Sequence, residues 1–559
     1  MSAVNSQVTI NNVDVPPAAI PDEGVAKTQK GPRFWLIFCS ICLSLFAAAL
    51  ELTVVSTALP TIASDLHIDE FTWVGSAYAL ASTAFLPMSG AMAEVFGRRP
   101  ALLFCLACFF LGSGICGGAS DSAMMLAGRT VQGLGGGGIQ ALGYIVLADI
   151  TTLRERGVYA SLFGLTWSIA SLIGPIVGGT LADQGQWRWI FYMNLPIAGV
   201  ASALVGVLLN LPTPPGTLSE KLAKIDWIGN AIVIGSTTSA AIGLTWGGVT
   251  APWDSAQTLA PLIIGLVGLV LFMVYEAKWA KYPLVPFHVV NNRTSVSGYL
   301  QTFLSAVGAL CLTYMYPVYF QAVKNATPIK SGVYLLGMSA LVPAAIVSGV
   351  LVKKTGRYRP QMLVGWCLPV IGTGLMTTLH AYHTVGRAIG YLIIAAVGIG
   401  AVYSTTMFPI QAPLPIQSSA LSLSFMSFVR AFAGIWGVTI GSTVLQNQAN
   451  KNLPAWFKAQ LPGGIDVAYS AIPRIPMLPP DQRFEVNEAF ALSLKVVWEV
   501  LIGILGLGLL SALLMKDVPL HSVVDQKWTM QENAASAAAD KEKAIEMDTV
   551  VNVKLGQEQ

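Results

Sequence analysis

The sequence predicts an all-α integral membrane protein with fourteen membrane-spanning helices, and three observations support this. Of the 559 residues, 54% are hydrophobic and only 11% are charged, whereas a soluble domain carries about 25% charged residues. The apolar residues form long runs, and the basic residues gather in alternate connections between those runs. A chain with so little charge cannot cover its surface for water, so much of that surface must face lipid.

Each apolar run is long enough to cross a bilayer, because about 20 apolar residues in a helix span a hydrocarbon core of roughly 30 Å. Helices are required because lipid offers the backbone no hydrogen-bond partners. The predicted spans are approximately Trp35–Leu59, Trp73–Ala93, Ala101–Ala119, Ala123–Ala148, Ser161–Ala182, Ile190–Leu211, Ile225–Trp246, Leu259–Tyr275, Val296–Phe320, Val333–Val352, Met362–Leu379, Ala388–Phe408, Leu421–Leu445 and Val496–Met515.

The basic residues of the short connections predict that both termini are cytoplasmic. With the N-terminus inside, thirteen Lys and Arg residues fall in the short cytoplasmic connections and four in the opposite ones, and positive charge concentrates on the cytoplasmic side. We expect the cell membrane, with a vacuolar or vesicle membrane as the alternative. The sequon at Asn325 then lies outside, where it is a candidate for glycosylation. The net charge of +3 is too small to indicate nucleic-acid binding.

One short motif occurs twice with the same spacing, at two predicted cytoplasmic helix ends. The two copies read Gly90-x-x-x-Glu94-x-x-Gly97-Arg98 and Gly349-x-x-x-Lys353-x-x-Gly356-Arg357. If the seventh and eighth spans are an insertion, these copies occupy equivalent places in two six-helix halves. Many secondary transporters are built from such repeats, with the substrate site between them.

This repeat predicts the domain organisation. The expected parts are a disordered cytoplasmic N-terminus (1–33), a first six-helix bundle (34–211), two inserted helices with their linkers (212–295), a second six-helix bundle (296–515) with a long extracytoplasmic loop (446–495), and a cytoplasmic tail (516–559).

Three ionisable residues lie inside predicted spans, where a charge costs on the order of 2.5–3.5 kcal/mol and therefore marks a partner or a pathway. Glu51 lies roughly 12 Å and Arg129 roughly 10 Å from the outer surface, at 1.5 Å per residue, so the two can pair. Glu51 is then either a proton carrier or half of a static ion pair, and both readings stay open. Arg430 lies nearer mid-membrane, where it either neutralises an anionic substrate or pairs with a carboxylate such as that of Glu499.

The substrate cavity is expected between the halves, lined by aromatic and polar residues of the first, fourth, ninth and thirteenth spans. Its candidate residues are Tyr314, Tyr316, Arg430 and Trp436.

Two glycine-rich stretches lie inside predicted spans. The stretch from Gly133 to Gly138 matches G-x-G-x-x-G, but a dinucleotide site needs a preceding strand and a βαβ unit, so we interpret these glycines as helix-packing residues. Gly174 and Gly178 form a second small-x-x-x-small contact, and Pro175 between them removes a backbone hydrogen bond. This bent segment is either an ordinary packing seam or a hinge and seal.

No pattern in the sequence indicates an enzyme. The phosphate-binding G-x-x-x-x-G-K-[ST] motif is absent, so ATP is not the expected energy source, and so is the zinc motif H-E-x-x-H. His380 and His383 lie in a predicted outer loop and are not expected to bind metal. We therefore predict neither a cofactor nor a metal.

Five segments resemble the major facilitator superfamily, in particular its fourteen-helix drug:proton antiporter group and most closely the fungal members. They are Leu50–Pro60, Gly90–Arg99, Arg129–Gly133, Gly174–Gly179 and Trp187–Pro196, in the order and on the spans that the family shows. Two departures occur in the loop signature G-x-L-A-D-R-x-G-R-R, where Glu94 replaces Asp and Val95 replaces the first Arg. In the first span, Glu51 replaces the family's Asp.

The resemblance implies a monomeric, proton-coupled exporter of an amphipathic drug, toxin or secondary metabolite, working by alternating access. It implies that Glu51, Arg129 and Gln132 serve proton coupling. It assigns gating or structural roles to Gly90, Glu94, Gly97, Arg98, Gly174, Pro175 and Gly178. An importer of a nutrient or siderophore with the same fold is the alternative. A non-transporting membrane sensor is a second one, although the tail of about 44 residues is too short and polar for a folded sensor domain.

Overall fold

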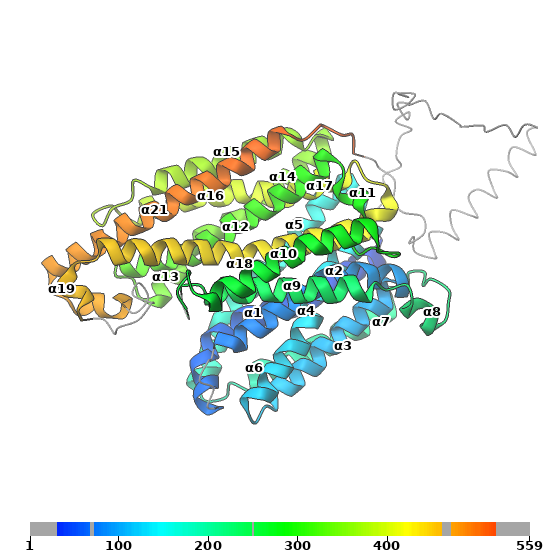
Figure 1. Cartoon of the computed structure of the whole chain (residues 1–559), viewed down its shortest axis with the longest axis horizontal. Helices are drawn as coiled ribbons and strands as arrows, with labels where there is room; N and C mark the ends of the chain where they lie inside the picture. Colours follow the sequence, from blue (N-terminus) through cyan, green and yellow to red (C-terminus); the bar gives the residue numbers. More distant parts are fainter. Residues whose placement is uncertain (1–30, 67–71, 249–250, 461–470, 521–559) are drawn as a thin grey trace, which may run out of the picture.

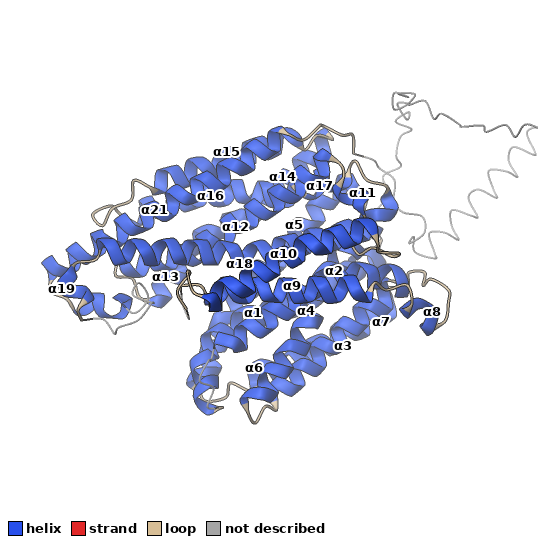
Figure 2. Cartoon of the chain, viewed as in Figure 1, coloured by secondary structure: helices blue, strands red, loops and turns tan. Residues whose placement is uncertain are grey.

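The computed structural model describes residues 31–66, 72–248, 251–460 and 471–520 (Figure 1). Within these ranges every regular element is a helix (Figure 2), and one isolated backbone bridge joins Gly247 to Ala251. The all-α prediction is therefore confirmed. Among the described residues, thirteen helical segments are long and apolar enough to cross a membrane.

The first bundle begins with five long helices and ends with a broken one. Its elements are α1 (Pro32–Asp65), α2 (Thr72–Phe96), α3 (Arg98–Gly117), α4 (Ser122–Ile150), α5 (Leu153–Asp183), α6 (Trp189–Tyr192) and α7 (Asn194–Leu208). The predicted span Ile190–Leu211 corresponds to α6 and α7 together, so the chain turns at Met193 and Asn194 begins a new helix.

The second bundle contains more short segments. Its elements are α11 (Phe287–Val290), α12 (Arg293–Ala322), α13 (Pro328–Leu335), η1 (Leu336–Ala340), α14 (Leu341–Thr355), α15 (Arg359–Met376), α16 (Val385–Thr405), α17 (Met407–Gln411), η2 (Ile416–Ser418), α18 (Ser419–Asn452), α19 (Ala455–Lys458), η3 (Ile472–Met477) and α21 (Pro480–Leu513).

Two predictions in the second bundle need adjustment. The run Met362–Leu379 is the helix α15, which packs beside α16 and α21, but it has only 18 residues and begins with the polar turn Arg359–Gln361. It is therefore less apolar than the thirteen other segments. The predicted loop 446–495 is shorter than expected, because α18 continues to Asn452 and α21 already begins at Pro480.

Glycines bring α2, α3 and α4 into close contact. A Cβ atom at Gly135 would lie 2.5 Å from the carbonyl oxygen of Cys105, and one at Gly137 would lie 2.3 Å from that of Ser82. Only glycine lets the backbones approach so closely. The stretch from Gly133 to Gly138 therefore lies inside a helix and serves packing, as the sequence indicated.

Both copies of the repeated motif place a glycine with positive φ at the end of a helix. Gly97 follows α2 with φ of +91°, and Gly356 follows α14 with φ of +68°. Side chains strongly disfavour this left-handed region, so glycine is needed at both helix ends. A glycine of positive φ at both places supports the proposed equivalence of α2 and α14, although ψ is 161° at Gly97 and 5° at Gly356.

Between the two bundles in sequence lie α8 (Leu218–Leu222), α9 (Trp227–Trp246) and α10 (Ala256–Lys278). The helices α9 and α10 pack on each other, and α9 also contacts α2 and α18, one helix from each bundle. Figure 1 shows this pair in front of the line where the bundles meet. Its outer face is apolar, with exposed Ile264, Val267 and Leu271.

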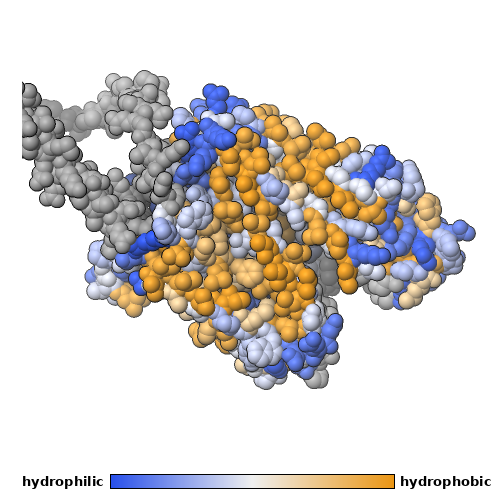
Figure 3. Space-filling model, turned by 180° about the vertical axis from the view of Figure 1, so that it is seen from behind, coloured by the Kyte–Doolittle hydropathy of each residue, from blue (hydrophilic) through white to orange (hydrophobic). Residues whose placement is uncertain are grey.

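The surface has the polarity expected of a membrane protein. Figure 3 shows hydrophobic side chains across the middle of one face and hydrophilic ones gathered toward its two ends. We call the end that carries Arg98 and Lys353 the Arg98 end, which is cytoplasmic in the predicted orientation, and the opposite end the Asp65 end.

Candidate functional site

A buried polar cluster lies inside the first bundle and contains the three residues predicted for proton coupling. Glu51 of α1 is 0% exposed, and Arg129 of α4 is 1% exposed. The Arg129 guanidinium forms an ion pair with Glu51 through Nη1, and the same nitrogen donates to the Gln132 side-chain oxygen at 2.7 Å. The structure therefore brings these three side chains together, and the matched depths of Glu51 and Arg129 had indicated the contact between those two.

Neighbouring helices complete the cluster. The Asn194 amide at the start of α7 donates to the second carboxylate oxygen of Glu51. Gln132 donates in turn to the Ser113 hydroxyl of α3 at 2.8 Å, and Arg129 Nε donates to the Val74 carbonyl of α2 at 2.8 Å. Five helices thus hold one charge pair by hydrogen bonds, which a buried pair needs in order to offset the cost of desolvation.

An aromatic ring covers part of the Arg129 guanidinium. Its carbon lies 4.7 Å from the centre of the Tyr78 ring, a distance at which a cation–π interaction contributes. The Tyr78 hydroxyl donates to the Ala48 carbonyl at 3.3 Å and so ties α2 to α1. A Cβ atom at Gly136 would lie 2.0 Å from that hydroxyl, so glycine at this place makes room for the tyrosine.

This arrangement suits a reversible proton site. A proton arriving on the Glu51 carboxylate would neutralise it and weaken its attraction for Arg129, while the other hydrogen bonds of the guanidinium remain. A change in the charge of Glu51 therefore changes the forces among α1, α4 and α7 at once.

The glycine–proline segment of α5 packs directly beside this cluster. A Cβ atom at Gly174 would lie 2.0 Å from the Thr53 hydroxyl, which is two residues from Glu51 on α1. That hydroxyl also donates to the Ala170 carbonyl of α5 at 3.3 Å. Gly178 is buried on the same helix, whereas Pro175 is exposed.

At the Arg98 end, the predicted loop residues form a second polar group. The buried Arg98 side chain forms an ion pair with Asp149 at 2.8 Å and donates to the Ala93 carbonyl at 2.9 Å. It therefore fixes the ends of α2 and α4 relative to each other. Glu94 is half-buried near the end of α2.

The two bundles also meet near the Arg98 end through charged and polar side chains. Glu155 forms an ion pair with Lys353 at 2.8 Å, and Arg154 donates to the Lys353 carbonyl at 2.8 Å. Arg156 donates to the Gln411 side chain of α17. These contacts join the start of α5 to α14 and α17.

Glycines form two further crossings between the bundles. A Cβ atom at Gly349 of α14 would lie 2.8 Å from the Gly157 carbonyl carbon of α5, and one at Gly90 of α2 would lie 2.7 Å from the Ser424 Cβ of α18. Both motif glycines therefore touch the opposite bundle.

Arg430 lies where three helices of both bundles meet, and it is 6% exposed. Its guanidinium stacks 3.8 Å from the centre of the Tyr403 ring of α16 and donates to the Tyr144 hydroxyl of α4 at 3.4 Å. The predicted pairing with Glu499 is not seen, because Glu499 is half exposed and lies 3.9 Å from Lys495. The ion pairs among the described residues do not include Arg430.

The remaining candidate cavity residues are not brought together. Tyr316 is fully buried and donates to the Ala388 carbonyl at 3.3 Å, whereas Tyr314 on the same helix is 51% exposed. Trp436 is half-buried on α18 and its shielded Nε1 has no partner among the described residues.

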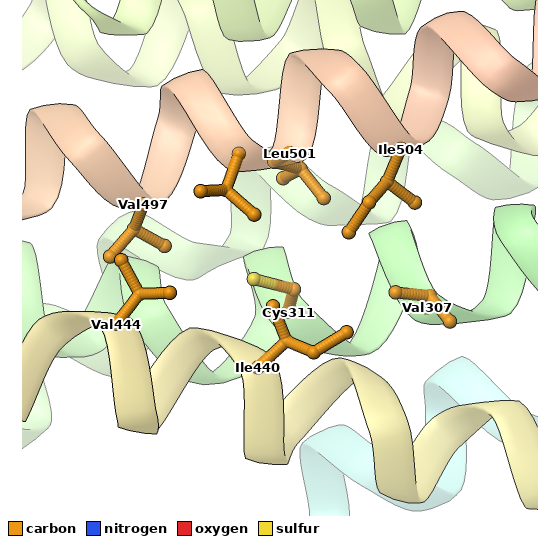
Figure 4. A pocket seen from close by; sticks show the side chains of 8 residues that line it. Val307, Cys311, Ile440, Val444, Val497, Leu501 and Ile504 are labelled. Atoms are coloured by element: carbon orange, nitrogen blue, oxygen red, sulfur yellow. The ribbon is translucent and has the colours of Figure 1, made fainter.

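An apolar gap lies between α12, α18 and α21. Figure 4 shows the side chains that surround it, among them Cys311, Val444 and Leu501. It has no room for a water molecule. This gap is too small and too apolar to bind an amphipathic substrate.

The candidate glycosylation residue Asn325 lies in the turn between α12 and α13, with φ of +51°. The Asn487 side-chain amide is oriented so that both its oxygen and its nitrogen form hydrogen bonds. In this orientation the Asn487 oxygen accepts from Asn325 Nδ2 at 2.8 Å. The nitrogen that would carry a glycan is therefore engaged with α21.

Sequence reasoning missed several residues of these sites. Asn194 lies in the segment Trp187–Pro196, which resembles the family, but its position in the sequence does not indicate that its side chain reaches Glu51. Ser113 and Tyr78 are small or aromatic residues inside apolar runs and give no signal of their own. Tyr144 and Tyr403 are likewise identified only because folding places both of them beside Arg430.

Comparison with known proteins matches this geometry to one family. The family model described as Major Facilitator Superfamily matches residues 41–438. The chain is 40% identical over 515 residues to "Efflux pump FUS6" of Gibberella fujikuroi, with 90% of this chain and 93% of that protein covered. It is 38% identical over 523 residues to "Acurin A biosynthesis cluster MFS-type transporter" of Aspergillus aculeatus, with 92% and 94% covered.

A solved structure supports the fold independently. The human organic anion transporter MFSD10 (TETRAN) superimposes with a TM-score of 0.52 and 12% identity, covering 85% of this chain and all of that one. The match of the family model over most of the chain, the two long relatives and the shared helical fold lead to one conclusion. The chain is a multi-pass membrane protein that belongs to the Major Facilitator Superfamily.

Proposed function

We propose that the chain is a proton-coupled exporter of amphipathic small molecules, such as toxins or secondary metabolites, and that it acts without enzymatic chemistry or a cofactor. The observation that carries the proposal is the ion pair of Glu51 with Arg129, fully buried in lipid-spanning helices and held by Asn194 and Gln132. Burial of this charge pair costs free energy, so the pair must be stabilised by its surroundings or must serve the function of the protein. The names of the relatives, efflux pump and biosynthesis-cluster transporter, favour the export of metabolites.

In this proposal Glu51 takes up a proton from the Asp65 side, and Arg129 and Gln132 stabilise its ionised form. The bundles of 34–211 and 296–515 rock against each other, with the contacts at the Arg98 end closing one side. Gly174, Pro175 and Gly178 keep α5 tight against α1 beside the proton site. We place both termini in the cytoplasm and the protein in the cell membrane as a monomer.

Inverted membrane vesicles test the direction and the coupling. Vesicles from cells that express the full chain, acidified inside, should accumulate amphipathic dyes from a panel with one neutral, one cationic and one anionic member. Accumulation should stop when a protonophore collapses the gradient. Vesicles carrying Glu51→Gln should not respond to the gradient, although the protein remains in the membrane.

Right-side-out vesicles separate the two directions. An exporter loads inverted vesicles, whereas an importer of a nutrient or siderophore loads right-side-out vesicles with an acidic exterior. Gradient-independent accumulation in both orientations would overturn proton coupling. Equal accumulation by Glu51→Gln and the unaltered chain would remove Glu51 from the mechanism.

A further inference from the structure

The buried guanidinium of Arg430 makes only long hydrogen bonds, and among the described residues none of them goes to a carboxylate. Arg156 is also buried, with carbonyl and amide oxygens as hydrogen-bond acceptors and an Nε without a partner among the described residues, but its bond to the Ala148 carbonyl is 2.9 Å long. Arg98 and Arg129 each form an ion pair with a carboxylate. Arg430 instead donates to the Tyr403 carbonyl and the Thr406 hydroxyl, both at 3.3 Å, and to the Tyr144 hydroxyl at 3.4 Å. Hydrogen bonds from a guanidinium to a charged acceptor are usually about 2.7–2.9 Å long.

One donor of this guanidinium is unused. The Arg430 Nε is shielded from solvent and has no hydrogen-bond partner among the described residues. A buried donor without a partner costs on the order of 1–3 kcal/mol, and more when the group is charged. The Tyr403 ring, whose centre lies 3.8 Å from the guanidinium carbon, offsets part of this cost through a cation–π interaction. The ring lies over the face of the guanidinium, so it cannot accept the Nε proton, which points outward in the guanidinium plane.

The position of Arg430 suits a ligand of a transporter. It lies eleven residues into α18, about 16 Å from the start of that helix at 1.5 Å per residue. Its neighbours come from both bundles, Tyr144 from α4 and Tyr403 and Thr406 from α16 and its C-cap. A group bound here would contact both halves of the transporter.

We propose that Arg430, with the hydroxyls of Tyr144 and Thr406, binds the carboxylate or other anionic group of the exported compound. The guanidinium has a free donor for a planar anion. The Tyr144 hydroxyl supplies a further donor, and so does the Thr406 hydroxyl once it leaves the Tyr403 carbonyl, to which it donates at 3.4 Å. The aromatic rings of Tyr403 and Tyr144 provide the apolar contact that the body of an amphipathic molecule needs. This inference rests on the proposed export function and names the substrate class for it.

A binding measurement tests the anion site without requiring transport. The full-length protein is purified in detergent and titrated with dansylaminoundecanoic acid and with its methyl ester, and the signal of protein-free micelles is subtracted. The two probes differ in the negative charge and in one methyl group. The unaltered protein should bind the acid about 10- to 100-fold more tightly than the ester, the range expected for hydrogen bonds to a charged group.

The substitutions separate binding from folding. Arg430→Gln should remove the preference for the acid, and Arg430→Lys should keep only part of it, because an ammonium is not a planar fork. Arg387→Gln is the matched control, since Arg387 also lies beside a tyrosine, Tyr391, but on the exposed surface. It should leave the preference unchanged. A purely structural Arg430 would change the melting temperature without changing the ratio of the two affinities.

The outcomes distinguish this site from the export function. Glu51→Gln should abolish proton-driven transport yet keep the acid preference, since the Arg430 site remains intact. Failure of transport by the unaltered chain together with an Arg430-dependent preference would reject export and keep the anion site. An unaltered protein without preference for the acid, whether it binds both probes or neither, overturns the anion site. A preference that survives in Arg430→Gln also overturns it.

Discussion

The amide of Gly90 donates a hydrogen bond to the hydroxyl of Ser424, 334 residues further along the chain, at 3.2 Å. The same hydroxyl donates to the Pro87 carbonyl at 3.2 Å, so one serine ties α18 to α2. The motif-equivalent Gly349 makes the corresponding close crossing with Gly157 of α5. The two crossings hold the bundles together near the Arg98 end.

Side chains at these glycines should open that end. We expect Gly349→Val to lower the unfolding free energy by about 1–3 kcal/mol, the usual effect of overpacking, or to favour the state in which α14 and α5 are apart. In the second case, a cysteine in place of Ser161 would be alkylated faster than the same cysteine in a chain that keeps Gly349. Ser161 is buried on α5, one turn after Gly157. Melting temperature and alkylation rate measure the two effects.

Gly164→Val is the control for this experiment. Gly164 lies on α5, the helix that Gly349 crosses, and a Cβ atom there would meet no atom of the described residues within 4 Å. This change should therefore leave both quantities nearly unaltered. Equal behaviour of the Gly349 and Gly164 variants would contradict the role of the crossing.

The contact of Gly174 with Thr53 predicts a non-additive pair of substitutions. Gly174→Ala alone should impair transport and lower stability, because the new methyl group meets the Thr53 hydroxyl. Thr53→Ala removes that hydroxyl, so the double variant should recover part of the loss, with a coupling of about 0.5–3 kcal/mol. Thermal unfolding of the four proteins gives this coupling.

Gly179 provides the comparison for this cycle, since a Cβ atom there would lie in open space. Gly179→Ala should be nearly neutral, with or without Thr53→Ala. If the destabilisation of the double variant Gly174→Ala with Thr53→Ala equals the sum of the two single effects, the two residues do not act through their contact.

Arg129 should not tolerate replacement by lysine. One guanidinium reaches Glu51, Gln132 and the Val74 carbonyl at once, and a lysine ammonium cannot reproduce this planar arrangement. We expect Arg129→Lys to reduce gradient-driven transport at least about 10-fold while the charge is kept, a loss of about 1.4 kcal/mol or more in transition-state terms. Initial rates in inverted vesicles measure it, and a rate equal to that of the unaltered chain would argue against a geometric role.

The ion pair between Glu155 and Lys353 should matter little by itself. The two side chains are 25% and 46% exposed, and pairs of this kind contribute about 0.2–1 kcal/mol. Lys353→Ala should therefore shift the melting temperature only slightly. The double variant Glu155→Lys with Lys353→Glu exchanges the two charges and should recover the small loss in melting temperature. A large loss in Lys353→Ala would show that this residue has a further role in closing the Arg98 end.

The helices could be predicted from sequence because apolar runs of the required length leave few alternatives. The matched depths of Glu51 and Arg129 also allowed their contact to be anticipated, since both lie on helices with a known direction. The run that became α15 and the break at Met193 were harder to predict. The polar turn Arg359–Gln361 belongs to α15 but lies before the predicted bounds of the run, and the segment around Met193 is apolar enough to be interpreted as one continuous span.

The partners of the buried charges could not be predicted. Asn194 reaches Glu51 from a helix 143 residues away, and Tyr403 stacks on Arg430 only because α16 and α18 cross at that depth. Such contacts depend on helix rotation and tilt, which single-chain periodicity does not determine. Tyr314 and Tyr316 illustrate this, since a rotation of two residues separates an exposed side chain from a buried one.

Proton movement driven by substrate shows whether Glu51 couples proton entry to export. Purified protein is reconstituted into liposomes loaded with a transported dye, and a trapped pH indicator follows the interior. Export of the dye should acidify the interior of liposomes that contain the unaltered chain, and Glu51→Gln should bind the dye without acidification. Acidification by Glu51→Gln at the unaltered rate would show that Glu51 does not carry the proton.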